Sequence, residues 1–187
     1  MVRSCLMYFD AFDGRNRNNS SMVKNLEIEE CEDISCVELS HSISVKEIAK
    51  IYQNFDVILA VGESELLTDF AEIEAVAKVK HDEVHNTLDF PKLLKIQVNE
   101  VYDPANNYTC NKLNHFLIKK MKPGGLIFCF VHVPVNTRHN TAIKSDLLKL
   151  LMYMRSRGQR EHKVLAKIES KFERGYTDVF QTPCTRG

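Results

Sequence analysis

The feature of this sequence that most constrains its fold is an unbroken apolar run, Leu126-Ile127-Phe128-Cys129-Phe130-Val131. Successive side chains of a strand point to opposite faces of a sheet, so a strand with this composition must be buried on both faces. The turn signal Lys122-Pro123-Gly124-Gly125 precedes the run. Strands of this kind occur in parallel sheets that helices cover on both sides, so the run predicts an α/β protein.

Strand and helix patterns alternate along the rest of the chain. Strands are predicted at Val2–Phe9, Cys36–Ile43, Val57–Val61 and Leu93–Val101. Helices are predicted after a cap at Ser20 or Ser21, at Val45–Phe55, at Cys110–Ile118 and at Ser145–Arg157, which Glu161–Phe172 extends or follows. The segment Glu72–Val84 fits either a helix or a strand. This order predicts a three-layer α/β/α sandwich with a mostly parallel mixed sheet, in which 2–9, 36–43, 57–61 and 126–131 lie together.

Composition limits the class of protein. The chain has 187 residues and 44% hydrophobic content, which suits one domain spanning 1–187 with a substantial core. Lys+Arg and Asp+Glu both number 25, so bulk charge indicates neither a nucleic-acid partner nor an anionic membrane. The apolar runs are too short to span a membrane, and the six cysteines form no zinc-type CxxC pairs. We expect a cytoplasmic protein with reduced thiols and no metal or cofactor.

Cys110 is a candidate nucleophile because of its place at a predicted helix start. Thr109 is the predicted N-cap, which puts Cys110 in the first turn. The partial positive charge of a helix N-terminus stabilises a thiolate, and its free N–H groups can hold an oxyanion. We therefore expect the pKa of Cys110 to lie below the ordinary value of about 8.5. The alternative is a small packing residue, which is the commoner role of a cysteine.

His132 is a candidate base because it ends the buried run, in His132-Val133-Pro134. The carboxyl ends of strands in open α/β sheets are where ligands and catalytic groups gather. A hydrogen-bonded structural histidine is the alternative. A cysteine and a histidine that the fold brings together form a nucleophile–base pair, and one helix and one strand join these two.

The two segments Ala105-Asn106-Asn107-Tyr108-Thr109-Cys110-Asn111 and Phe130-Val131-His132-Val133-Pro134 resemble the catalytic blocks of the type-I pyroglutamyl peptidases, the pyrrolidone-carboxylate peptidase family. Their order and separation are similar to those of the family. The resemblance implies a cysteine peptidase that removes an N-terminal pyroglutamyl residue from peptides, with Cys110 as the nucleophile and His132 as the general base.

The resemblance also suggests a third catalytic residue. Glu72-Ile73-Glu74-Ala75-Val76-Ala77 is similar to the segment whose glutamate completes the family's triad. Matching Ala75-Val76 makes Glu72 the first candidate and Glu74 the second. A carboxylate in this role orients the imidazole and stabilises its protonated form. We expect Cys110, His132 and one of these glutamates to share a cleft, with the sulfur about 3–4 Å from the imidazole.

A weaker similarity concerns substrate binding. Phe9-Asp10-Ala11-Phe12 followed by Asn18-Asn19-Ser20 resembles the family's N-terminal pattern of Gly-Phe-Xaa-Pro-Phe-Gly and Asn-Pro-Ser/Thr. The resemblance implies that Phe9, Phe12 and Asn18 bind the substrate, with the two rings around the pyrrolidone. Core packing is the alternative for both phenylalanines.

The chain also departs from the family pattern. Asp82–Asn86 stands where the family has Arg-Ile-Pro-Asp-Asn, and the segment from Asn86 to Ala105 is shorter than the family's. The missing arginine and the shortened middle favour a second class of function, a catalytically inactive relative that acts as a binding or interaction module. The shortened middle also removes segments that form oligomer contacts in relatives, which weakens the expectation of a homo-oligomer.

Overall fold

The computed structural model describes residues 2–11, 18–26, 34–65, 67, 69–89, 97–99, 109–121, 125–136 and 140–180. Its centre is a six-stranded sheet in the order β2-β1-β3-β8-β4-β7. The strands are β1 (Ser4–Phe9), β2 (Ile34–Leu39), β3 (Val57–Ser64), β4 (Glu72–Glu74), β7 (Gln97–Asn99) and β8 (Ile127–Pro134). Strands β2, β1, β3 and β8 are parallel, whereas β4 runs antiparallel to β8. The expected mostly parallel mixed sheet is confirmed.

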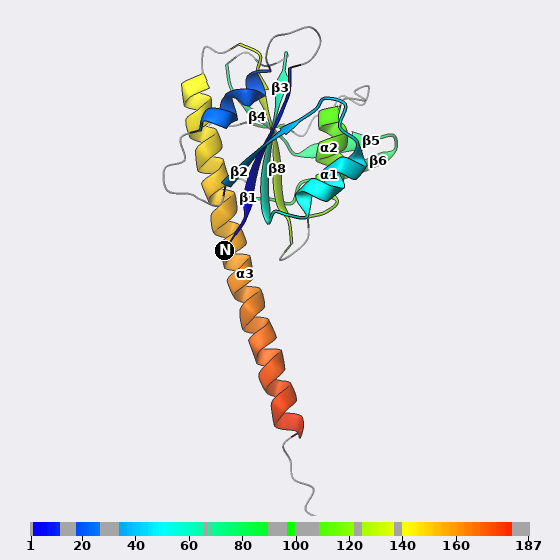
Figure 1. Cartoon of the computed structure of the whole chain (residues 1–187), viewed down its shortest axis with the longest axis vertical. Coiled ribbons are helices and arrows are strands. Elements are labelled where there is room, and N and C mark those ends of the chain that lie inside the picture. Colours follow the sequence, from blue (N-terminus) through cyan, green and yellow to red (C-terminus); the bar gives the residue numbers. More distant parts are fainter. Residues whose placement is uncertain are drawn as a thin grey trace, which may run out of the picture.

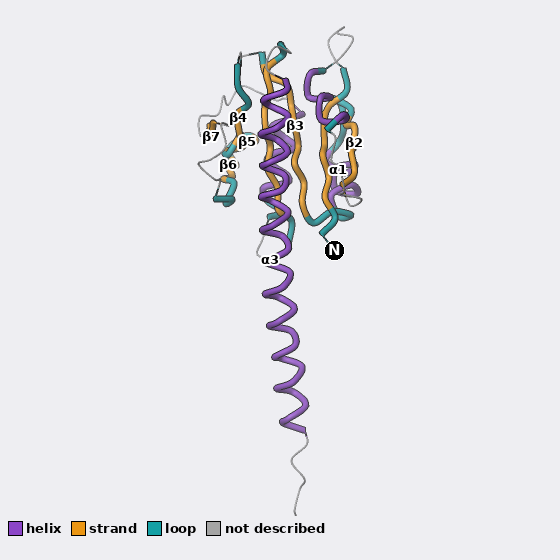
Figure 2. The backbone as a smooth tube through the Cα atoms, turned by 90° about the vertical axis from the view of Figure 1, so that its left-hand side faces the viewer, coloured by secondary structure: helices purple, strands orange, loops and turns teal. Residues whose placement is uncertain are grey.

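Helices cover both faces of this sheet (Figure 1). α1 (Val45–Tyr52) and α2 (Thr109–Ile118) lie on one side, and η1 (Asn19–Asn25) and α3 (Asn140–Phe180) lie on the other. Figure 2 shows α3 running across its face of the sheet and continuing beyond the amino ends of the strands. The arrangement is the predicted α/β/α fold.

The alternation of side chains along β8 explains the two cores. Cys129, Val131 and Val133 face α3, whereas Phe128 and Phe130 face α1 and α2. All five are fully buried. β8 is an inner strand between β3 and β4, which confirms that the apolar run 126–131 is not on a sheet edge.

The four strands expected to share a sheet do so, but β2 is not buried on both faces. It is an edge strand with three exposed residues, Ser35, Cys36 and Glu38. It also covers Ile34–Leu39 rather than 36–43. An edge strand has only one neighbour, so its outer side chains reach solvent.

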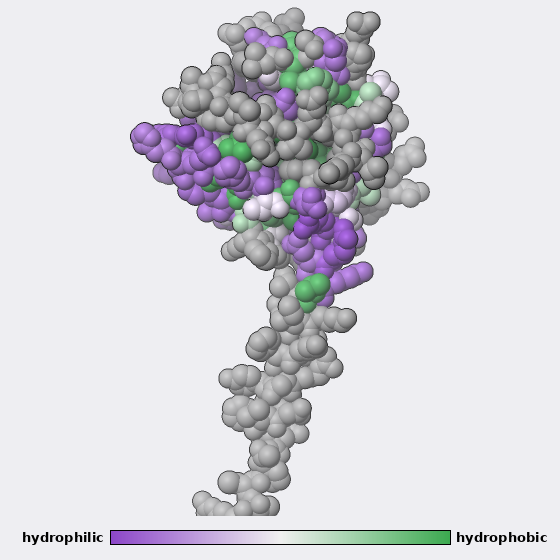
Figure 3. Space-filling model, turned by 180° about the vertical axis from the view of Figure 1, so that it is seen from behind, coloured by the Kyte–Doolittle hydropathy of each residue, from purple (hydrophilic) through white to green (hydrophobic). Residues whose placement is uncertain are grey.

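The ambiguous segment 72–84 forms strands, not a helix. After β4, the chain makes an antiparallel hairpin of β5 (Val76–Val79) and β6 (Asp82–His85). Lys80, at the turn, has a positive φ of 59°. Figure 3 shows hydrophilic side chains gathered at the edge of the molecule to which this hairpin projects. The predicted strand 93–101 is represented by β7, and its other residues lie outside the described part.

Local signals explain where the helices begin. Ser44 and Glu47 form a capping box at α1, as the side chain of each residue bonds the backbone of the other. The short helix η1 begins at Asn19, and its cap is Asn18 rather than Ser20 or Ser21. α3 joins the two segments 145–157 and 161–172 into one continuous helix.

Candidate active site

His132 and Glu74 form a close pair at the junction of β8 and β4. The register places Glu72 directly opposite His132 and Ile73 opposite Val131. Glu74 therefore reaches His132 diagonally, and its Oε2 lies 2.8 Å from Nε2. The side chains of His132 and Glu74 are 20% and 15% exposed, so the contact is largely shielded from water but is still partly accessible to it.

This contact determines which imidazole nitrogen can act as a base. A carboxylate only accepts hydrogen bonds, so Nε2 of His132 donates to Glu74, and Nδ1 of the neutral ring keeps a free lone pair. Within the described part of the chain, Nδ1 is buried and has no hydrogen-bond partner. It faces Gly62 of β3, where an added Cβ would lie 3.5 Å from it.

Of the two glutamates predicted as candidates for the third residue of the triad, the second candidate, Glu74, is the one that bonds His132. Glu72 is on the same face of β4 and opposite His132, yet the two side chains form no hydrogen bond. The imidazole leans along β8 toward Phe130, with 5.0 Å between the ring centroids. That orientation turns Nε2 toward the diagonal neighbour, which the sequence pattern could not show.

Cys110 lies in the first turn of α2, as expected, and on the face of the sheet that carries His132. It packs against the core that includes Phe130. Thr109 is already helical and is not an N-cap; its hydroxyl donates to the carbonyl of His41 instead. The boundary differs from the prediction by one residue.

The expected lowering of the Cys110 pKa is wrong for this structure. Burial, followed by the negative charge of Glu74, raises the pKa of the thiol to about 12. The backbone N–H groups of Cys110 and Asn111 lower it, as a helix N-terminus should, but by less. Cys110 is thus a neutral thiol near pH 7, and it forms no hydrogen bond with Nδ1 of His132.

Two buried asparagines of α2, which the sequence analysis did not single out, attach this helix to the strands beside it. Asn111 donates to the carbonyl of Lys78 (2.7 Å) and accepts from its N–H (3.3 Å). Asn114 donates to the carbonyl of Glu74 (3.1 Å). Asparagine at inward positions of an otherwise apolar helix face is the signal that could have revealed them.

Of the three residues that the resemblance implies for substrate binding, the structure describes Phe9 and Asn18. Phe9 is buried at the end of β1, with its ring centroid 6.4 Å from that of Phe130, so it borders the core next to His132. Asn18 caps η1 by accepting from the N–H of Ser20, which is a structural contact. Phe12 lies outside the described residues.

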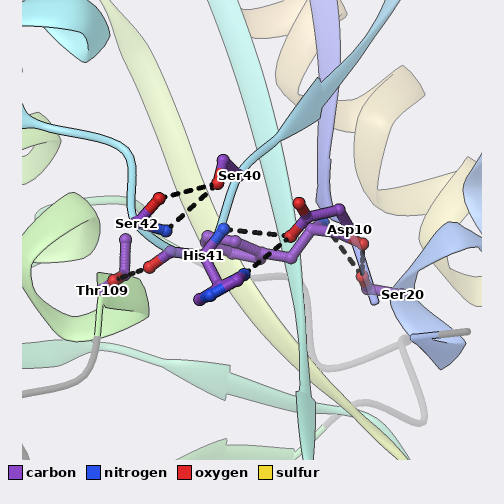
Figure 4. A network of polar contacts seen from close by, with 7 residues as sticks. Asp10, Ser20, Ser40, His41, Ser42 and Thr109 are labelled. Carbon is purple, nitrogen blue, oxygen red and sulfur yellow. Dashed lines mark hydrogen bonds and ion pairs between the residues drawn. The ribbon is translucent and has the colours of Figure 1, made fainter. Parts of the chain in front are cut away.

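A polar network connects the end of β1 with the start of α2 (Figure 4). Asp10 accepts from the N–H of His41 (3.0 Å) and lies 3.3 Å from its imidazole Nδ1. The carbonyl of His41 accepts from Thr109. Ser20 in turn bonds the backbone of Phe9. The loop after β1 and the helix of Cys110 are therefore held by one set of contacts.

A pocket of about 400 Å³ opens at the amino ends of β1, β3 and β8, where α1 and α2 end, away from Cys110 at the start of α2. Arg3, Asp56 and Lys119 are among its lining residues. Arg3 pairs with Asp56, and Lys119 pairs with Asp82 of the hairpin. Because these charges already have partners, we assign no role in catalysis to this pocket.

No group of three or more His, Cys, Asp or Glu residues in the described part of the chain is arranged to hold a metal ion. The cysteines that the structure describes, Cys5, Cys36, Cys110 and Cys129, carry free thiols. Among the described helices, none combines the length and apolar character needed to cross a membrane.

Comparisons with known proteins assign no function to this chain, so its function has to be inferred from the residues described above. No protein-family model matches the chain, and no curated protein matches its sequence.

Proposed function

We propose that this protein is a cysteine peptidase that removes an N-terminal pyroglutamyl residue from peptides. The observation that carries the proposal is the bonded pair of His132 and Glu74 on the sheet face where Cys110 begins α2. A base held by a carboxylate, together with a cysteine at a helix N-terminus on the same face of the sheet, is the set of groups that acyl transfer to sulfur uses.

The reaction starts from a neutral thiol. Nδ1 of His132 accepts the Cys110 proton while the sulfur attacks the pyroglutamyl carbonyl, and Glu74 stabilises the imidazolium that results. The N–H groups of Cys110 and Asn111 at the start of α2 are the donors available to the oxyanion. The imidazolium then protonates the leaving amine as the C–N bond breaks, which leaves an acyl thioester that water hydrolyses.

The chemistry of the site suits an uncharged acyl group. The ring of Phe130 contacts His132, Phe9 contacts Phe130 in turn, and the carboxylate bonded to His132 is that of Glu74. A pyrrolidone ring has no free amino group and can enter such surroundings without an ion-pair partner. We also propose a cytoplasmic location, because the described cysteines are free thiols.

A second candidate function is a catalytically inactive relative that binds a ligand or partner. The observation that favours it is the state of Cys110, whose pKa is raised to about 12 and whose thiol makes no hydrogen bond with His132. In this alternative the His132–Glu74 pair is structural.

Cleavage of a fluorogenic pyroglutamyl amide separates the two candidates. The peptidase proposal expects turnover by the wild type and none above background for Cys110→Ser, with unchanged folding by circular dichroism. Cys129→Ser is the matched control, because this thiol is buried on the face of the sheet away from His132. Turnover that survives Cys110→Ser, or no turnover in a folded wild type, would reject the proposal.

A further inference from the structure

Asn114 is a buried polar residue whose presence in α2 is not explained by packing alone. It is fully buried in α2, and its Nδ2 donates to the carbonyl of Glu74. A backbone carbonyl can only accept, so the amide nitrogen must face Glu74. Its own Oδ1 has no hydrogen-bond partner among the described residues. A buried amide at this position is retained at a cost, which an apolar residue would avoid.

Glu74 is the last residue of β4, where the chain leaves the six-stranded sheet for the β5–β6 hairpin. The pairing of β4 with β8 covers Glu72 and Ile73 and stops before Glu74. The side chain of Glu74 must nevertheless hold Nε2 of His132 at 2.8 Å. On its other side Glu74 still pairs with Asn99 of β7, whereas the β8 ladder has ended, and the bond from Asn114 adds a contact to the Glu74 carbonyl there.

Asn114 also lies one helical turn after Cys110. Residues four apart share one face of an α-helix, so Cys110 and Asn114 face the same side of α2. One turn of α2 therefore carries both Cys110, the proposed nucleophile, and Asn114, which donates to the backbone carbonyl of Glu74.

We infer that Asn114 is a positioning residue that couples the Glu74–His132 pair to the helix of Cys110. This inference rests on the proposed peptidase function and adds a residue that acts through Glu74 rather than on the substrate. A misplacement of about 1 Å at such a site can reduce a rate about 100-fold.

The test is a double-mutant cycle between Asn114→Leu and Glu74→Gln. Leucine has a similar volume and also removes the unpartnered Oδ1, so it preserves folding better than Asn114→Ala, which serves as a second variant. Asn86→Ala is the matched control, because the Asn86 amide likewise donates to a sheet carbonyl, that of Phe128 (2.9 Å). Thermal melts confirm that each variant is folded.

Two readouts are measured on each variant. The first is steady-state cleavage of a pyroglutamyl amide, for which Asn114→Leu should lower kcat about 10- to 100-fold with KM nearly unchanged. The second is the pH dependence of iodoacetamide labelling at Cys110. Glu74 disfavours the thiolate, so Glu74→Gln should shift the labelling curve to lower pH, and Asn114→Leu should shift it the same way.

If Asn114 acts through Glu74, adding Asn114→Leu to Glu74→Gln should change neither readout further, and Asn86→Ala should change neither alone. Effects of the two substitutions that simply add, or an Asn114→Leu variant that behaves like Asn86→Ala, would overturn the inference. A wild type without turnover rejects the peptidase function instead, and the labelling curves still decide whether Asn114 acts through Glu74.

Discussion

The junction of β8 and β4 and the start of α2 differ in how far they are prepared for catalysis. At the junction, His132 and Glu74 are bonded at 2.8 Å and set by strand register. At the helix, Cys110 is a neutral thiol whose pKa is raised to about 12, without a bond to His132. In the proposed mechanism the fold therefore assembles the base in advance, whereas the nucleophile depends on that base during the reaction.

The largest expected effect comes from removing the charge that orients the base. In Glu74→Gln, the amide can donate to Nε2, which transfers the ring proton to Nδ1 and removes the Nδ1 lone pair that would accept the thiol proton. We expect kcat for a pyroglutamyl amide to fall about 10²- to 10⁴-fold. Stopped assays over a range of substrate concentrations measure this fall.

Glu72→Gln is the matched control for that experiment, because Glu72 is on the same strand and face but makes no bond with His132. It should keep kcat within about threefold of the wild type. A larger loss in Glu72→Gln than in Glu74→Gln would restore Glu72 as the third catalytic residue.

A smaller effect is expected from crowding the base without changing its chemistry. A Cβ at Gly62 would lie 2.9 Å from Cζ of the fully buried Phe130 ring, which contacts His132. Gly62→Ala should therefore cost about 1–3 kcal/mol of unfolding free energy and lower kcat about 10-fold. Urea unfolding and the cleavage assay measure the two effects.

Gly158→Ala in α3 offers a control, since its nearest neighbour would be a valine methyl at 3.3 Å and alanine favours the helix. It should change stability by no more than about 1 kcal/mol. Equal losses of unfolding free energy in Gly62→Ala and Gly158→Ala would show that the space next to His132 has no special importance.

The smallest effect concerns the resting thiol. Because burial raises the pKa of Cys110, the thiolate fraction near pH 7 should be negligible and should grow only as the pH approaches about 12. Iodoacetamide should therefore label the exposed Cys36 before Cys110 at pH 7–8. Peptide mapping by mass spectrometry gives both rates, and faster labelling of Cys110 would show a preformed thiolate.

Periodicity and burial made much of the fold predictable. The apolar run 126–131 predicted an inner strand, and the helical periodicity of 45–55 predicted α1. The short strands β4 to β6 were not predictable as such, because three or four residues carry too little periodicity to separate a strand from a helix.

The candidate site was predictable only in part. The positions of Cys110 and His132 follow from one helix and one strand, which sequence pattern defines. The choice of Glu74 over Glu72 depends on antiparallel register and on the lean of the imidazole, which are tertiary properties. The raised pKa of Cys110 arises from burial and from the carboxylate of Glu74, which lies 36 residues earlier in the chain (110 − 74 = 36).

Rapid quenching can capture the acyl-enzyme that Cys110 should form when His132 accepts its proton. The protein is mixed with a pyroglutamyl aryl ester, quenched in acid and mapped by mass spectrometry. We expect one pyroglutamyl group on Cys110 in the wild type and none there in His132→Ala. An adduct that forms equally in both proteins, or that forms on the exposed Cys36 and not on Cys110, would contradict it.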